Sequence, residues 1–322
     1  MRRRPVELSL ALSACVAVAM LAGCSGAADR DLGGVKGGAL STPPDPGFGH
    51  VHGLGLNASD GAVYAATHYG VWRLPGPSGP GGPGDGTDDT AATPVRVADR
   101  WQDTMGFTVA GPDVFYGSGH PDLREDSPSL LGFIVSRDRA RTWRPVALSG
   151  SVDFHDLAAV GSRVYGYDST SGRMFVSADT GRTWTPRAPE ELRDLTVDPT
   201  DPDRVLAISS GGLLESTDAG LTFRPILSAP GLLLVDWADG MLAGASIDGT
   251  VWLAPQGGPK GTWRRGGRLA GAPQAFTVAA GGRLLASDDD GVKLSTDGGA
   301  SWTLLAGFSD AISGDNHDGD QR

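Results

Sequence analysis

The sequence predicts an all-β fold, a β-propeller of six four-stranded blades, and three observations support it. Short apolar strands recur at a spacing of roughly 35–50 residues, which is typical of propeller blades. A phrase of the form Ser-x-Asp-x-Gly-x-Thr-Trp recurs between these strands. Helical periodicity is absent outside the first 23 residues. Seven blades would also fit, if one blade has diverged or if residues before the repeats supply strands.

The repeated phrase predicts a tight turn, which we call the Ser-x-Asp turn. Its Ser and Asp side chains can bind nearby backbone amides, its Gly supplies a positive φ, and its closing aromatic packs beneath the turn. We expect a hairpin between the third and fourth strands of a blade. Four copies occupy residues 136–143, 177–184, 216–223 and 295–302. The predicted structural aspartates are Asp138, Asp179, Asp218 and Asp297.

The N-terminus has the features of a bacterial lipoprotein signal. Three arginines at positions 2–4 precede an apolar stretch at 8–22, which is too short to span a bilayer. Leu21-Ala22-Gly23-Cys24 matches a lipobox, so residues 1–23 are expected to be removed and Cys24 lipidated. An ordinary secretory signal is the alternative. The other cysteine, Cys15, lies within the signal, and the mature domain would therefore have no disulfide.

Charge and composition indicate the compartment and the partners. The chain has a net charge of −11, and removal of residues 1–23, which carry three Arg and one Glu, would make it −13. An acidic surface argues against nucleic acid as a partner and against electrostatic docking on anionic lipid. We therefore expect an extracytoplasmic protein of the cell envelope, attached to the membrane through lipid on Cys24. We expect a flexible tether at residues 24–47, the propeller at 48–306 and a polar tail at 307–322.

The repeating units are expected to begin near residues 51, 106, 153, 193, 233 and 274. Two of them lack a complete Ser-x-Asp turn. The first has a run rich in Pro, Gly and Asp at 75–94, which predicts a disordered loop between its third and fourth strands. The fifth has a degenerate version at 254–263 that keeps Thr262 and Trp263.

Five of the six histidines occur at related places in the first three units, and the sixth, His317, is in the polar tail. His52 and His155 open inner strands, whereas His68 and His120 close second strands. The start of a first strand and the end of a second strand lie on the same face of a propeller. We therefore expect these four imidazoles at the rim of the central channel, joined by His50 if the lead-in to the first strand is ordered.

This predicted ligand rim consists of His50, His52, His68, Tyr69, His120, His155 and Asp156. His50 and His52 alternate along an extended chain, so their imidazoles point the same way, and His68 is one hairpin away. If a metal binds, the expected ligands are His52, His68 and one of His50, His120 or His155. Imidazole suits zinc, copper and nickel, and Met105 nearby would favour copper. The open alternatives are a metal-free ligand pocket and a structural role that satisfies backbone groups.

Several stretches, at 49–55, 66–70, 105–108, 119–122 and 153–155, together with the Ser-x-Asp turns, resemble a group of bacterial Asp-box (BNR-repeat) propeller proteins. Many of these are lipoproteins, and they are commonly labelled glycosyl hydrolases or exo-sialidases. The Asp-box is shared with sortilin-type receptors and photosystem II assembly factors. The resemblance implies a secreted propeller whose Asp-boxes lie away from the ligand face.

The hydrolase label finds limited support among the residues. Sialidases use three arginines, a Tyr–Glu pair and an Asp acid, but here only Arg124 and Arg193 are arginine candidates. A glycosidase needs two carboxylates flanking the bond, for which Asp122, Glu125, Asp153 and Asp168 are the candidates. The expected function is therefore a membrane-anchored binding module whose rim takes a metal ion, a glycan or a protein. The alternatives are a sialidase-like glycoside hydrolase and an envelope assembly or scaffold factor.

Overall fold

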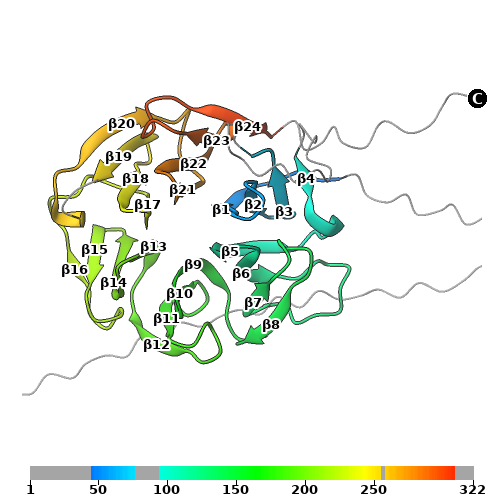
Figure 1. Cartoon of the computed structure of the whole chain (residues 1–322). Helices are drawn as coiled ribbons and strands as arrows, with labels where there is room; N and C mark the ends of the chain where they lie inside the picture. Colours follow the sequence, from blue (N-terminus) through cyan, green and yellow to red (C-terminus); the bar gives the residue numbers. More distant parts are fainter. Residues whose placement is uncertain (1–44, 77–93, 255–257, 309–322) are drawn as a thin grey trace, which may run out of the picture. The chain divides into compact units, whose positions relative to one another are not determined.

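The computed structural model describes residues 45–76, 94–254 and 258–308. These residues form six antiparallel sheets of four strands, arranged as blades around a centre (Figure 1). The prediction of an all-β, six-bladed propeller is confirmed, and the described residues contain no seventh blade. The expected signal, Cys24, tether residues 24–44, insert residues 77–93 and tail residues 309–322 lie outside the described part of the chain.

Each blade uses four strands that are consecutive in the sequence. Blade one contains β1 (Val51–Leu56), β2 (Val63–Thr67), β3 (Gly70–Leu74) and β4 (Val95–Arg96). Blade two contains β5 (Asp103–Gly111), β6 (Val114–His120), β7 (Phe133–Ser136) and β8 (Arg144–Ala147). Blade three contains β9 (Phe154–Val160), β10 (Arg163–Asp168), β11 (Arg173–Ser177) and β12 (Thr185–Pro189).

The remaining blades follow the same order. Blade four contains β13 (Leu192–Asp198), β14 (Asp201–Ser209), β15 (Gly212–Ser216) and β16 (Arg224–Pro225). Blade five contains β17 (Leu234–Ala238), β18 (Met241–Ala245), β19 (Thr250–Ala254) and β20 (Arg264–Arg268). Blade six contains β21 (Ala275–Ala279), β22 (Arg283–Asp288), β23 (Gly291–Ser295) and β24 (Thr303–Gly307). Two short 3₁₀ turns, Val97–Asp99 and Gly258–Lys260, occur between strands.

The first strand of every blade faces the centre of the ring (Figure 1). These inner strands, β1, β5, β9, β13, β17 and β21, begin within one residue of the expected positions in five blades. The exception is β5, which begins at Asp103, three residues before the predicted start. This extension matters because Asp103 belongs to the candidate site.

The Ser-x-Asp turns connect the third and fourth strands of blades two, three, four and six, as predicted. In blade four the Ser216 hydroxyl accepts a hydrogen bond from the backbone N–H of Gly220 at 2.8 Å and donates to Asp218 at 2.8 Å. Asp218 also accepts bonds from the Thr222 N–H and hydroxyl, at 2.9 and 2.7 Å. The Thr222 contacts lower the pKa of Asp218 to about 2. These carboxylates therefore stabilise the turns. Because successive strands of a blade run in opposite directions, the end of a third strand lies on the face opposite the end of a second strand, where the histidines are.

The ring is closed by side-chain packing, because no strand is exchanged between the first and last blades. Phe48 is 1% exposed and packs with residues of both blades. Its ring centroid lies 4.5 Å from that of Trp72 and 6.3 Å from that of Phe308. The backbone N–H of Val51 donates to Gln274 across the same junction at 3.1 Å.

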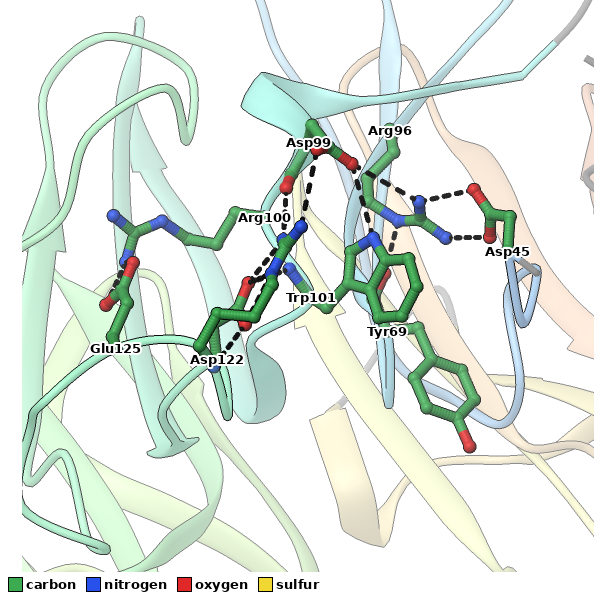
Figure 2. A network of polar contacts seen from close by, with 9 residues as sticks. Asp45, Tyr69, Arg96, Asp99, Arg100, Trp101, Asp122 and Glu125 are labelled. Carbon is green, nitrogen blue, oxygen red and sulfur yellow. Dashed lines mark hydrogen bonds and ion pairs between the residues drawn. The ribbon is translucent and has the colours of Figure 1, made fainter. Parts of the chain in front are cut away.

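The chain just before the propeller is attached to blade one. The sequence places Asp45 in the tether, but its carboxylate forms an ion pair with Arg96 (Figure 2). The Arg96 guanidinium in turn lies 4.4 Å from the centre of the Trp72 ring and 5.3 Å from that of Trp101. Arg96 therefore joins the entry of the chain to the outer part of the blade.

Candidate metal-binding rim

Potential metal ligands occupy equivalent places in the first three blades. His68 donates its backbone N–H to His50 at 3.2 Å. Asp103 lies opposite His120 in the register of β5 and β6. Ser169 donates its backbone N–H to the backbone carbonyl of Asp153 at 3.1 Å. Each of these pairs joins the start of a first strand to the end of a second strand, and the residue two positions after the first member also lies at this end of the blade. We call these nine residues the donor rim. They are His50, His52 and His68 in blade one, Asp103, Met105 and His120 in blade two, and Asp153, His155 and Ser169 in blade three.

Three side chains of the donor rim meet closely. The Nε2 atom of His52 lies 3.1 Å from Nδ1 of His68, and each nitrogen approaches Oδ1 of Asp103, at 3.4 and 3.1 Å. Among the residues that the structure describes, this is the group of three whose ligand atoms all lie within 4.8 Å of one another. We call it the blade-one site.

These separations match one face of a tetrahedral metal site. Zinc–nitrogen bonds of about 2.0–2.1 Å at tetrahedral angles place neighbouring ligand atoms about 3.3 Å apart. The observed distances are 3.1, 3.1 and 3.4 Å. The three donor atoms are therefore spaced so that one ion could contact all of them without a change in the backbone.

His50 is the nearest candidate for a fourth ligand. Its ring centroid lies 5.0 Å from that of His52 and 5.9 Å from that of His68. The pairing of β1 with β2 shifts register between Val51 and Gly53, so His52 lies within a bulge. Bulges redirect side chains at the ends of strands. The three imidazoles of blade one are thus brought together, as the sequence predicted.

The electrostatics favour the forms that bind metal. Burial lowers the pKa of His52, and the hydrogen bond that His52 donates to Asp103 restores it only in part. Burial and the neighbouring imidazoles also lower the pKa of His50. For Asp103, burial acts to raise the pKa, but hydrogen bonds from His52 and His68 outweigh it and lower the value. A neutral imidazole needs only to carry its proton on the other ring nitrogen to bind an ion, and the ionised carboxylate is already in its metal-binding form.

A second group of ligands lies at the boundary of blades two and three. His155 contacts Oδ2 of Asp153 through Nε2 at 2.9 Å, and His120 approaches the same oxygen through Nε2 at 3.5 Å. The Nδ1 atom of His120 is bonded to the carbonyl of Ser129 at 2.8 Å. The predicted rim histidines thus divide into two groups, three around Asp103 and two around Asp153.

The central channel is lined by carboxylates. Its volume is about 340 Å³, and Asp156, Asp194 and Asp236 line it together with His52. Asp156 accepts a hydrogen bond from the Leu195 N–H at 2.5 Å, and Asp194 accepts one from the Val235 N–H at 2.5 Å. Burial raises the pKa of Asp156 to about 7 and also raises that of Asp194, which the charge of Asp156 raises further. Asp156, expected in the ligand rim, therefore lines the channel and links blade three to blade four.

The other predicted carboxylates are engaged in structural contacts. Arg124 binds Asp122, which also accepts the backbone N–H of Trp101 at 2.8 Å (Figure 2). Glu125 forms an ion pair with Arg100 at 3.0 Å (Figure 2). Asp168 accepts bonds from the Asp153 N–H and from the side chains of residues 170 and 171. Asp153 differs from these three because it faces the imidazoles.

Tyr69 belongs to the predicted rim, and Asp103 joins the rim only in the structure. The Tyr69 side chain is 38% exposed, and its ring centroid lies 6.3 Å from that of His68. Asp103 was missed by sequence reasoning because the inner strand was expected to start after it. Its relation to Met105, two residues later, repeats the spacing of Asp153 and His155, and this spacing was the available signal.

Comparisons with known proteins bear mainly on the fold. No protein-family model matches the chain. A xyloglucanase from Paenibacillus sp is 30% identical over 165 residues, covering 46% of this chain and 15% of that protein. A xyloglucanase from Hypocrea jecorina (strain QM6a) is 28% identical over 177 residues, covering 50% of this chain and 20% of that protein. The chain thus spans a fifth or less of the length of these curated relatives.

Solved structures resemble the chain at low sequence identity. A chain of a nidogen/laminin complex superposes with a TM-score of 0.55 and 13% identity, covering 76% of this chain and 92% of that one. The GH74 xyloglucanase from Xanthomonas campestris gives 0.49 and 19%, covering 80% and 45%. YCF48 bound to D1 peptide gives 0.43 and 13%, covering 63% and 68%. The chain is a β-propeller. In the described residues, no helix is both long and apolar enough to cross a membrane.

Proposed function

We propose that this propeller is a binding module that takes a transition-metal ion at the blade-one site. The observation that carries the proposal is the spacing of His52, His68 and Asp103, whose donor atoms are 3.1–3.4 Å apart. A water molecule or His50 would supply the fourth ligand. The half-buried position at the rim leaves the ion accessible from the solvent.

The donor set indicates which ions to test. Two imidazoles and one carboxylate suit zinc and divalent copper, and calcium or magnesium would require mainly oxygen ligands. Met105 occupies the rim position of blade two that His52 occupies in blade one. A thioether at the rim favours copper, so copper and zinc are the two ions to compare.

The test is metal content and affinity of the purified full-length chain. We expect copper or zinc by elemental analysis, and saturable binding by calorimetry whose blade-one component, one ion per chain, is lost in a His52→Ala, His68→Ala double variant. Asp103→Asn retains the shape of the side chain and is expected to weaken binding by at least the roughly 10–100-fold that loss of an outer-shell partner costs.

The matched control is Asp201→Asn, an exposed carboxylate at the opposite face that contacts the N–H of Asp203. It should leave the affinity unchanged. If the double variant binds as many ions as the unaltered chain and binds them as tightly, the blade-one site does not hold a metal. The same rim would then be screened against glycans and envelope proteins.

Glycoside hydrolysis is the second candidate, and the local sequence similarity to two xyloglucanases favours it. Xyloglucan is therefore the first polysaccharide to assay. Release of reducing sugar that Asp153→Asn abolishes, and that Asp201→Asn does not, would support hydrolysis. Binding of xyloglucan without cleavage would instead support a carbohydrate-binding propeller.

We further propose that the chain is an Asp-box lipoprotein of the cell envelope. The support is the lipobox at Leu21-Ala22-Gly23-Cys24 and the four Ser-x-Asp turns. Replacing Cys24 with Ala should abolish incorporation of labelled fatty acid and release the protein from the membrane fraction. Retention of the label in this variant would contradict lipidation at Cys24.

A further inference from the structure

We infer that the rim carries a second transition-metal site, formed by His120, Asp153 and His155. It lies at the boundary of blades two and three and shares no residue with the blade-one site. We call it the blade-three site. The inference does not depend on metal binding at the blade-one site.

The register of the blades repeats the ligand positions of the blade-one site. His120 is the last residue of its second strand and His68 directly follows that of blade one. Asp153 precedes its inner strand at the position that Asp103 occupies in blade two. In both sites a histidine at the end of one blade faces an aspartate at the start of the next, at 3.1 Å for His68 and 3.5 Å for His120. The propeller repeat thus presents the same ligand pair at two successive boundaries.

The tautomer of His120 directs its free nitrogen toward Asp153. Its Nδ1 contacts the Ser129 carbonyl at 2.8 Å, and because a carbonyl only accepts hydrogen bonds, Nδ1 carries the proton. In a neutral imidazole the lone pair of Nε2 then points toward Asp153 Oδ2, 3.5 Å away. Two lone pairs that face each other need a cation between them, which is either a second proton on the imidazole or a metal ion. Metal-binding histidines commonly have this arrangement, with the other ring N–H bonded to a backbone carbonyl.

The Asp153 carboxylate has an oxygen without a hydrogen-bond partner in the described part of the chain. Asp153 is 4% exposed, and its Oδ1 atom has no hydrogen-bond partner among the described residues. A buried carboxylate oxygen without a partner carries a desolvation cost. The oxygen Oδ2 is meanwhile shared by two imidazoles. A metal ion bound by this carboxylate would compensate the charge of the buried group.

The ligands of the blade-three site are less tightly gathered than those of the blade-one site. The side chains of His120 and His155 are 42% and 39% exposed, so both imidazoles can be reached by an ion from the solvent. Asp153 itself is held in place because its backbone N–H is bonded to Asp168 at 2.9 Å. The Asp153 carboxylate and the His120 ring, which is bonded to Ser129, are therefore the fixed parts of the site, and His155 would turn toward the ion.

The test counts metal ions in the purified full-length chain and in matched variants. The unaltered chain should bind two copper ions, and His120→Ala, His155→Ala should bind one. His52→Ala, His68→Ala should also bind one, and the combined variant none. Electron paramagnetic resonance of the copper-loaded proteins should show one of two distinct signals in each double variant and both signals in the unaltered chain.

Asp153→Asn keeps the size of the side chain and is the second variant, with Asp201→Asn as its control. Unchanged stoichiometry and spectra in both His120→Ala, His155→Ala and Asp153→Asn would overturn the inference, even if the blade-one variant loses its ion. Loss of one ion in the blade-three variants alone would support it while contradicting the blade-one site. Circular dichroism of each variant shows whether the fold is retained, and a chain that binds no copper or zinc would refute both sites.

Discussion

The imidazole of His52 is largely buried, with 10% of its side chain exposed, and the loss of surrounding water lowers the pKa of both His52 and its neighbour His50. The channel carboxylates respond in the opposite sense, because burial raises the pKa of Asp156 and Asp194. Burial disfavours the charged form in both cases, but that form is the acid form of a histidine and the basic form of an aspartate. The two groups therefore make stability depend on pH with opposite signs.

The histidines should reduce stability on acidification. In the unfolded chain a histidine takes up its proton near pH 6.5, whereas folded His52 does so at lower pH. The unfolded state thus binds more protons below about pH 6.5, and the free energy of unfolding falls as the pH falls through this window. His52→Gln should show a smaller fall in metal-free urea titrations. His317→Gln, in the predicted tail, is the control and should follow the unaltered chain.

The channel carboxylates should reduce stability as the pH rises. Asp156 titrates in the folded chain at about 7, well above its unfolded value, so the folded state holds more protons between these limits. The stabilising contribution of the protonated Asp156 is fully present in acid and is lost as the pH rises toward 7. Asp194→Asn keeps an acceptor for the Val235 N–H and removes a charge. We expect it to raise the unfolding free energy at about pH 8 by on the order of 1 kcal/mol, with little effect near pH 4. A larger gain in acid would contradict this account.

At the scale of the element, the Ser-x-Asp turns show how one phrase adapts to different neighbours. The third turn residue after Ser lies at positive φ in every copy, as Arg139, Thr180, Ala219 or Gly298, and the next residue does too. That next residue is Gly181 in blade three, Gly220 in blade four and Ala140 in blade two. The backbone requirement is shared, but the packing around each turn differs.

Gly181→Ala should destabilise the protein more than Gly220→Ala. Both glycines have a positive φ, +81° and +75°, so each substitution carries the strain of about 1–2 kcal/mol for a left-handed residue. A methyl group at Gly181 would lie 2.0 Å from the Phe133 ring, which is fully buried. At Gly220 it would meet the flexible end of Met174, which can move.

Thermal and urea unfolding of the two variants checks this difference. The clash with Phe133 should add about 1–3 kcal/mol, the usual cost of overpacking a core. Equal losses in the two variants would show that the backbone strain alone sets the cost. The Ala140→Gly variant is informative beside them, since it relieves the same strain but removes a buried methyl group.

For the whole molecule, ring closure and the donor rim both involve blade one. Blade one meets blade six through Phe48 and the Val51–Gln274 hydrogen bond. On its other side it meets blade two through Asp103, which binds His52 and His68. The blade-one site thus depends on the packing of blade one against blade two as well as on the hairpin that carries its histidines.

Phe48→Ala should destabilise the whole propeller. Phe48 is 1% exposed and contacts the Trp72 and Phe308 rings, so truncation is expected to cost about 3–5 kcal/mol. Leu304→Ala in blade six is the control, because Leu304 is 50% exposed and should change stability by about 0.5 kcal/mol or less. Urea unfolding followed by tryptophan fluorescence measures both. A loss below about 1 kcal/mol for Phe48→Ala would mean that the ring closes without this contact.

The sequence by itself determined the six blades, their boundaries and the place of the Ser-x-Asp turns. Each of these rests on local chemistry, because short strands and turn residues act within one hairpin. The gathering of His50, His52 and His68 was also predictable, since strand alternation and one hairpin relate these residues. The number of these histidines and their positions in the repeat can be read from the sequence without knowing any contact between blades.

The tertiary structure alone decided which partners the histidines meet. Asp103 reaches His68 from the next blade, and Asp153 lies between His120 and His155. The angle and stagger between neighbouring blades set these contacts, and both result from side-chain packing across the blade boundary. The same packing places Asp156 in the central channel. Its pKa is shifted by burial, and this burial exists only once the ring has closed.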